Sequence, residues 1–178
     1  MSTDRWGYLN AEQRRFLLLD NGVGPFVANL LINGVIAWLL FRNATHVPLF
    51  GQSSIAGDTI ATAFLLPAIT CLIVTPLARA RVRCGKLAAA AEAGSRRVPR
   101  NMMVRAVMIG LIGLILFAPV TLLLFRAAGI DALTPAHFIV FKAMFAAIEG
   151  TLVTPFMALW AISDPLPAIA TVQPAVGT

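Results

Sequence analysis

The sequence predicts an all-α, polytopic membrane protein with four transmembrane helices. Of its 178 residues, 58% are hydrophobic and only 12% are charged, which is too little charge to cover a soluble domain of this size. The mean hydropathy of +0.82 comes from four long apolar runs. Each run approaches the ~20 residues with which an α-helix crosses ~30 Å of hydrocarbon. Two short motifs that recur along the chain indicate that the four helices form two hairpins.

The segment ahead of the first apolar run is predicted to lie in the cytoplasm. Asn10 can cap a helix, and Gln13 three residues later completes a capping-box pattern. The resulting short helix over residues 10–20 would lie in the membrane interface, with Trp6 and Tyr8 as aromatic anchors. A frayed amphipathic tail is the alternative. No signal-peptide cleavage pattern follows, so the first span is expected to remain in the mature protein.

The spans define two hairpins within a single membrane domain. We predict them at residues 22–41, 59–78, 106–125 and 137–161. The chain then reads as a cytoplasmic segment (1–21), a first hairpin (22–78), a basic cytoplasmic connection (79–105), a second hairpin (106–161) and a cytoplasmic tail (162–178).

The segments between and after the spans carry weaker signals. Residues 87–93, rich in alanine and followed by Gly94, are expected to form a helical extension. The outer connections contain turn residues and are expected to hold nothing folded. The proline-containing tail after Asp164 is expected to be disordered.

Two short motifs recur in the same order. Leu39–Arg42 at the end of the first span recurs as Leu123–Arg126 at the end of the third, and Val74–Pro76 recurs as Val153–Pro155. Such recurrence predicts duplication of a two-helix hairpin. Because each hairpin has an even number of spans, both copies enter from the same side, which makes the repeats parallel.

The positions of the charges predict the orientation. The net charge is +6, and among the 14 Lys and Arg residues three precede the first span and eight lie between the second and third. The positive-inside rule then places both termini in the cytoplasm. Seven of these residues are predicted to face lipid headgroups: Arg79, Arg81, Arg83, Lys86, Arg96, Arg97 and Arg100. Groove-reading elements are missing, so nucleic acid is not expected as a partner.

Glu149 is the residue that most strongly indicates a function. It lies roughly 18 Å along the fourth span, close to the membrane midplane. A bare carboxylate there would cost at least a few kcal/mol, so the group should be protonated, paired or in contact with water. Two interpretations remain open, a neutral acid bonded to a neighbouring helix and a proton, cation or substrate site.

Other polar residues fall within the spans. Lys142 lies near the outer end of the fourth span and is expected to extend its ammonium outward to water. The repeat places Thr70 at the position equivalent to Glu149. Asn29 and Asn33, one helical turn apart, are natural polar partners for Glu149 or Thr70, although contacts that merely join helices are the alternative.

Chemistry beyond this carboxyl has little support in the sequence. The two cysteines cannot form a disulfide framework. We find no metal-ligand spacing, phosphate-binding loop or nucleophile motif. We therefore expect no enzyme activity, no metal and no cofactor. Small residues such as Ala143, Ala147, Gly110 and Gly113 predict tight helix packing.

One part of the sequence resembles a known class. The segment from Asn33 and Gly34 through Trp38, then Asp58, Thr59, Pro67 and the run Leu72–Ala78 followed by arginines, is similar to small uncharacterised bacterial inner-membrane proteins built from one or two such hairpins. The resemblance implies a bacterial inner membrane and carries over no functional residues.

The expected function is that of a small transporter or permease-like protein. Glu149 would serve as a proton- or cation-responsive group, in a homo-oligomer or with a membrane-protein partner, in contact with membrane lipid. The alternative is a non-catalytic structural or assembly subunit of a membrane complex.

Overall fold

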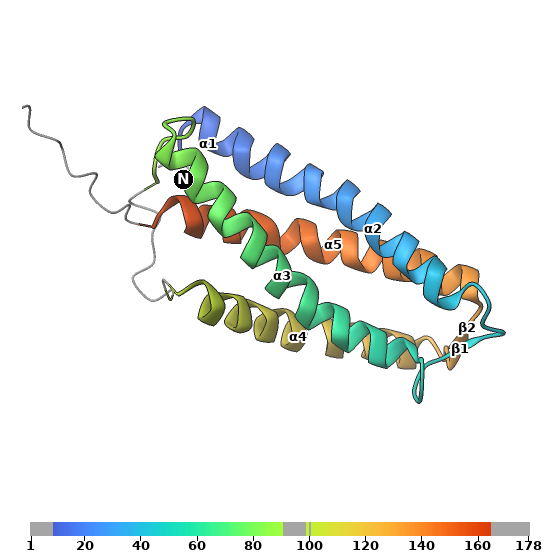
Figure 1. The fold of residues 1–178 in the computed structure, drawn as a ribbon. Helices are drawn as coiled ribbons and strands as arrows, with labels where there is room; N and C mark the ends of the chain where they lie inside the picture. The colour runs from blue at the N-terminus through green and yellow to red at the C-terminus, as the bar shows by residue number, and fades with distance from the viewer. Residues whose placement is uncertain (1–8, 91–98, 100, 165–178) are drawn as a thin grey trace, which may run out of the picture.

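The structure is a computed structural model that describes residues 9–90, 99 and 101–164. In this part of the chain four helices are long and apolar enough to cross a membrane, and Figure 1 shows them packed lengthwise into one bundle. The predicted four-span, all-α fold is thereby confirmed. The connections 42–54 and 128–134 lie at one end, which we call the loop side. The opposite end, where the first helix begins and the last one ends, is the terminal side (Figure 1).

The first membrane helix is longer than predicted. It runs through α1 (Ala11–Arg15), a π-helical segment η1 (Phe16–Val23) and α2 (Gly24–Phe41). The capping box of Asn10 and Gln13 is confirmed. The prediction of a separate interfacial helix over residues 10–20 is wrong, because η1 joins α1 to α2 without a break. The Gly24 N–H bonds to the carbonyl five residues back, and this wider turn accommodates Pro25, which has no N–H.

The other three membrane helices extend beyond the predicted spans at both ends. They are α3 (Ile55–Arg83), α4 (Met102–Ala127) and α5 (Pro135–Ile162). Each begins after a side-chain cap, from Ser54, Asn101 and Thr134 respectively. Such caps bond to N–H groups that the first turn leaves without partners. Each predicted span lies within its helix.

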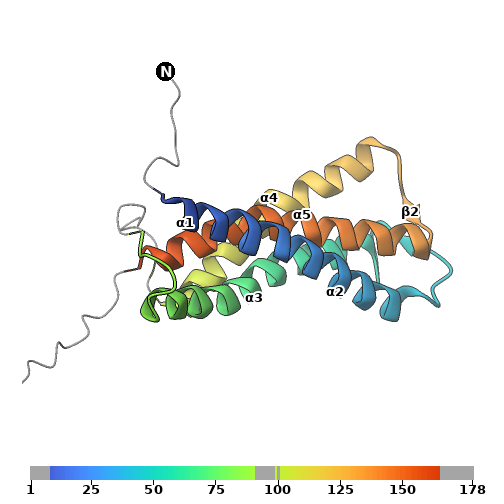
Figure 2. The same cartoon turned by 90° about the horizontal axis from the view of Figure 1, so that it is seen from above.

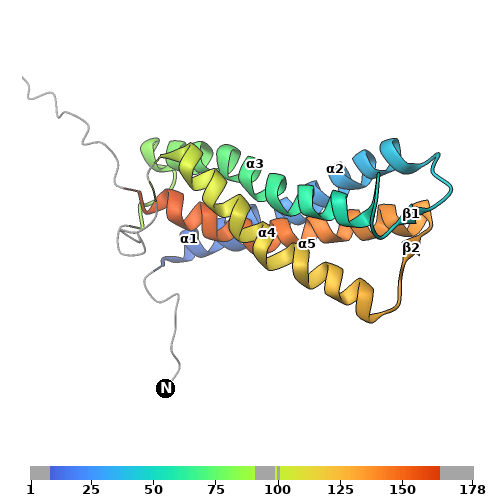
Figure 3. The ribbon, with the colours of Figure 1, turned by 90° about the horizontal axis from the view of Figure 1, so that it is seen from below.

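The bundle is built around α5. Helices α2 and α3 both pack against α5, and α4 packs against α3 with little contact to α5. Figures 2 and 3 show α4 leaning away from α5 towards the loop side. Each hairpin thus packs mainly against the other hairpin. This packing does not test whether one hairpin arose by duplication of the other, and the duplication stays a prediction.

Glycines allow the closest helix contacts. A methyl group at Gly113 of α4 would lie 2.5 Å from the carbonyl oxygen of Ala63 on α3, and one at Gly110 would lie 2.8 Å from that of Phe64. Both distances are too short for a carbon atom. The small residues predicted to favour tight packing therefore do so inside this chain, where Ala147 on α5 is also fully buried.

The loop side carries a small folded cap, contrary to the expectation. Strands β1 (Val47–Pro48) and β2 (Ala132–Leu133) pair antiparallel. The Leu49 N–H extends the pairing with a 2.7 Å bond to the Asp131 carbonyl. Val47, Leu49 and Phe138 are buried together beneath the strands. Turn residues identified these connections as irregular, but the pairing depends on contacts between two segments distant in sequence.

The terminal side departs from the sequence prediction after α3. Gly85 adopts a φ of 68°, which turns the chain out of the helix. Residues 87–90 are not helical; the Ala90 N–H bonds instead to the Ile162 carbonyl at 3.1 Å, and Gln13 Nε2 donates to the Ala88 carbonyl at 2.9 Å. The predicted extension is therefore wrong for residues 87–90. Its remainder, the tail after Asp164, and Trp6 and Tyr8 lie outside the described residues.

Candidate functional site

The carboxyl of Glu149 lies where three helices meet. Its side chain is fully buried on α5. A methyl group at Gly113 of α4 would lie 3.2 Å from Glu149 Oε1 and 2.8 Å from Cγ of Pro67 on α3. Neither carboxyl oxygen has a hydrogen-bond partner among the described residues. A charged carboxylate is costly in this setting, so the site requires a bound proton or another cation.

A backbone carbonyl adds a second oxygen to this junction. Pro67 has no N–H, so the helical hydrogen bond to the carbonyl of Ala63 is missing. That carbonyl oxygen lies 2.5 Å from the methyl position at Gly113 that Glu149 Oε1 also approaches. The face of α4 at Gly113 therefore meets two acceptor oxygens, Glu149 Oε1 and the Ala63 carbonyl oxygen.

The predicted polar partners do not bond to Glu149. Asn29 of α2 reaches α5 at Gly150, where its amide nitrogen occupies the space that a side chain would need. Asn33 Nδ2 donates to the Asn29 carbonyl within its own helix, at 3.1 Å. Thr70 is only partly buried. Within the described part of the chain no hydrogen bond joins any of the three to Glu149, and Asn29 instead packs α2 against α5.

Lys142 takes part in an ion pair that sequence analysis missed. The expectation that its ammonium reaches water is wrong, because Lys142 Nζ bonds to Asp58 Oδ1 of α3 and only 7% of its side chain is exposed. Its partner Asp58 is also largely buried, with 14% of its side chain exposed. The sequence did contain a signal for this pair, because Asp58 and Lys142 are opposite charges near the loop-side ends of two apolar spans. Beside this pair, Thr59 Oγ1 is buried and lacks a hydrogen-bond partner in the described structure.

A second charge cluster closes the terminal side. Arg105 of α4 is 1% exposed and donates to both oxygens of Asp164, at 3.0 and 2.8 Å. Arg79 of α3 donates to the same carboxyl at 2.7 Å. Burial alone would raise the pKa of Asp164, but the hydrogen bonds and charges of Arg105 and Arg79 outweigh it and hold that pKa below its ordinary value. The cluster joins α3, α4 and the end of α5.

The predicted lipid-facing basic residues fall into four groups. Arg79 belongs instead to the Asp164 cluster. Arg81 is half exposed, bonds to Asp20 at 2.6 Å and covers the Phe16 ring. Arg83 and Lys86 are exposed, and their contact with lipid stays a prediction. Arg96, Arg97 and Arg100 lie outside the described residues.

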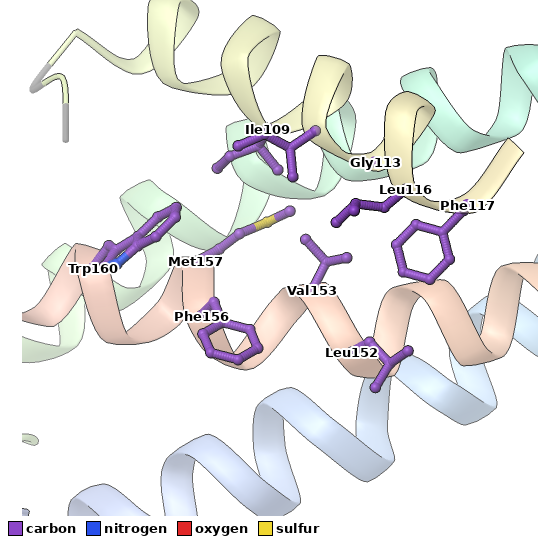
Figure 4. Close-up of a pocket in the computed structure, with 10 residues that line it drawn as sticks. Ile109, Gly113, Leu116, Phe117, Leu152, Val153, Phe156, Met157 and Trp160 are labelled. Carbon is purple, nitrogen blue, oxygen red and sulfur yellow. The ribbon is translucent and has the colours of Figure 1, made fainter. Parts of the chain in front are cut away.

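An apolar groove lies between α4 and α5, and Glu149 is not among the residues that line it. It encloses about 270 Å³ and includes Gly113, Phe117, Val153, Phe156, Met157 and Trp160 in its lining. Figure 4 shows side chains from both helices directed into the space between them. Gly113 borders both the groove and the Glu149 carboxyl, and Val153 follows Glu149 by one helical turn. The groove exists because α4 packs on α3 and diverges from α5.

The described residues contain no cluster of three or more His, Cys, Asp or Glu side chains that could hold a metal ion. Cys71 is buried and Cys84 is exposed, and Cys71 Sγ lies 3.5 Å from Thr75 Oγ1.

Comparison with known proteins finds no match to a family model, to a curated protein or to a solved structure. The resemblance to small hairpin proteins stays a prediction.

Proposed function

We propose that this protein is a small transporter of the bacterial inner membrane in which Glu149 binds and releases a proton during the transport cycle. The supporting observation is a fully buried carboxyl, near the middle of α5, the most buried of the four candidate spans, whose two oxygens lack partners in the described structure. An acid kept only for packing would be expected to donate to a nearby acceptor. An acid that must exchange its proton benefits from having no permanent partner.

The two charge clusters fit the requirements of a transport cycle. Lys142 and Asp58 join α5 to α3 on the loop side, and Arg105, Arg79 and Asp164 join three helices on the terminal side. Glu149 lies between them and is closed from both. Transport then requires one cluster to open while the other stays closed, which is the principle of alternating access. Thr59, with its unpartnered hydroxyl, would support water on the loop-side route.

We assign the terminal side to the cytoplasm. Arg81, Arg83 and Lys86 are exposed there, whereas Arg42 and Arg126 lie on the loop side. The excess of positive charge beside the terminal-side helix ends supports this orientation. Arg42 lies 4.6 Å above the Trp38 ring, which would anchor α2 at the opposite interface.

We further propose that the working unit is a homo-oligomer. The groove between α4 and α5 is only partly enclosed by the described residues. A second copy would supply the missing wall. An assembly subunit is the second candidate, and the same open face supports it, because a helix of another protein could fill the groove.

Proton movement in proteoliposomes tests the proposed function. Purified protein is reconstituted with a pH-sensitive dye inside, and an imposed voltage drives protons inward. We expect Glu149→Gln to reduce the protein-dependent proton flux to the rate of empty liposomes. Glu12→Gln makes the same change at an exposed carboxyl and should retain full flux. Equal flux from the wild-type protein and Glu149→Gln would refute the proposal.

A further inference from the structure

We infer that a charged pocket on the terminal side binds the phosphodiester group of an anionic phospholipid that carries a single negative charge. The pocket encloses about 240 Å³ between the first membrane helix and the end of α3. Five of the residues that line it are charged: Glu12, Arg15, Asp20, Arg81 and Lys86. The inference concerns a lipid site and does not depend on proton binding by Glu149.

The pocket lies at the level of the lipid headgroups. The first membrane helix has 31 residues, Ala11–Phe41, which is roughly 45 Å at the rise of an α-helix, whereas the hydrocarbon is ~30 Å thick. Arg42 directly after the helix marks the loop-side limit of the hydrocarbon, so the excess length extends beyond it on the terminal side. The pocket residues of this helix are all among its first ten, and Arg81 is the third residue from the end of α3.

One of the three basic side chains is already paired. Arg81 donates to Asp20 at 2.6 Å, and its guanidinium carbon lies 4.9 Å from the centre of the Phe16 ring. These two contacts hold the guanidinium between α3 and η1. The pair therefore shapes the pocket and adds little net charge to it.

Two basic side chains are left to bind an anion. Within the part of the chain that the structure describes, the side chains of Arg15 and Lys86 form no ion pair. Arg15 ends α1 and Lys86 lies in the turn after α3, and both line the same pocket. Charge-assisted hydrogen bonds from Arg and Lys hold phosphate groups in proteins. Two such side chains from distant segments around one cavity differ from scattered surface charge.

The net charge of the pocket limits the charge of its ligand. Three basic and two acidic side chains line it, which leaves one positive charge. A phosphodiester with a neutral headgroup supplies one negative charge. A second negative charge would lie close to Glu12 and Asp20, and a zwitterionic headgroup would leave the positive charge uncompensated. Phosphatidylglycerol has the matching chemistry.

Apolar side chains beside the pocket favour a lipid over a soluble phosphodiester. Leu77 precedes Arg81 by one turn on the same face of α3 and is 60% exposed, and Val23 at the end of η1 is 57% exposed. Both lie nearer the middle of the bundle than the pocket does. The acyl chains of a lipid held by its phosphate would cover these side chains, which a soluble phosphodiester could not do.

Native mass spectrometry of the purified, delipidated protein tests the site by counting the lipids bound per chain. The probes have identical acyl chains and differ in headgroup: phosphatidylglycerol, phosphatidylethanolamine and phosphatidylcholine. We expect one phosphatidylglycerol per chain to bind at least fivefold more tightly than either zwitterionic lipid. Glycerophosphoglycerol, the same headgroup without acyl chains, should not displace it at a tenfold excess over the lipid.

Variants locate the bound lipid. Arg15→Gln and Lys86→Gln should each weaken phosphatidylglycerol binding at least threefold, and the double variant should bind it no more tightly than phosphatidylethanolamine. The matched control is Arg83→Gln, which removes the same charge from an exposed residue at the same end of α3 that does not line the pocket. It should change the affinity less than twofold. Thermal unfolding of each variant reports whether the fold is retained.

Two results would overturn the inference. Equal binding of the three lipids, or weakening by Arg83→Gln as large as that by the pocket variants, would leave only the general attraction between basic residues and anionic lipid. Displacement of phosphatidylglycerol by glycerophosphoglycerol would overturn the lipid and make the pocket a site for a soluble phosphodiester.

Discussion

Gly113 shows how one residue controls both packing and the candidate site. A methyl group there would lie 2.5 Å from the Ala63 carbonyl oxygen. We predict that Gly113→Ala destabilises the bundle by roughly 1–3 kcal/mol, because α3 and α4 must separate. The matched control is Gly34→Ala, whose methyl group would meet only Ala143 Cβ at 3.5 Å, an ordinary contact. Thermal unfolding in detergent measures both; equal unfolding temperatures would contradict the packing described.

The Lys142–Asp58 pair offers a second residue-scale prediction. Lys142→Met should destabilise the protein by roughly 3–5 kcal/mol, since it leaves a buried carboxylate unpaired. The double variant with Asp58→Leu should recover most of that loss, because no lone charge remains. A double-mutant cycle from unfolding measurements gives the coupling between the two positions. If the effects of the two substitutions on the free energy of unfolding were additive, Lys142 and Asp58 would not stabilise each other, contrary to the geometry.

Sequence analysis located Glu149 but not its surroundings. Depth along an apolar span places a carboxyl near the midplane, and the structure agrees that it is buried. Which residues meet Glu149, here Gly113 and Ala63, is decided by the rotation of each helix about its axis. That rotation cannot be predicted from spans that are apolar on every side. Asp58 and Lys142 lie 84 residues apart, so their pairing also required the fold.

At the scale of elements, Asp164 connects the ends of three helices and gives a pH prediction. Its pKa is held below the ordinary value, so the folded protein binds the proton more weakly than the unfolded chain, whose Asp pKa is ~3.9. The stabilisation is fully present above about pH 5 and decreases as pH falls through ~3.9 towards the folded-state pKa. Asp164→Asn should be less stable near neutral pH and should lose less stability on acidification. Unfolding temperatures at several pH values test this; parallel curves would contradict it.

The membrane helices were predictable as elements because length and apolar composition suffice to identify them. The continuous helix from α1 to α2 was not, since Asn21, Gly22 and Pro25 suggest an interruption that a π-helical turn avoids. The β1–β2 pairing and the non-helical residues 87–90 depend on contacts with distant segments. Local propensity could not anticipate either feature.

At the scale of the whole molecule, the open face of α4 and α5 predicts an assembly. We expect a homo-oligomer when the complex is extracted from its own membrane in a lipid-preserving medium. Native mass spectrometry gives its mass and composition. Stoichiometric association with a different protein would instead favour the assembly subunit, and the groove would then be the first place to look for the partner's helix.

The order in which the four helices pack lay beyond sequence analysis. The motifs shared by the first and third spans suggested two hairpins, but each hairpin's helices could have packed mainly on each other. The structure pairs α2 with α5 and α3 with α4. Close contacts at Gly110, Gly113 and Gly150 favour this order, and small residues alone do not identify the helix they will meet.

The most direct test of the central claim is an infrared pH titration of the protein in lipid membranes, which follows the carbonyl stretch of un-ionised carboxyl groups. The account predicts a carboxyl band that responds to pH, disappears in Glu149→Gln and remains in Glu12→Gln. A Glu149 band that stays constant across the whole pH range would contradict the account. Glu149 would then be a neutral structural acid, and the chain would not exchange protons through it.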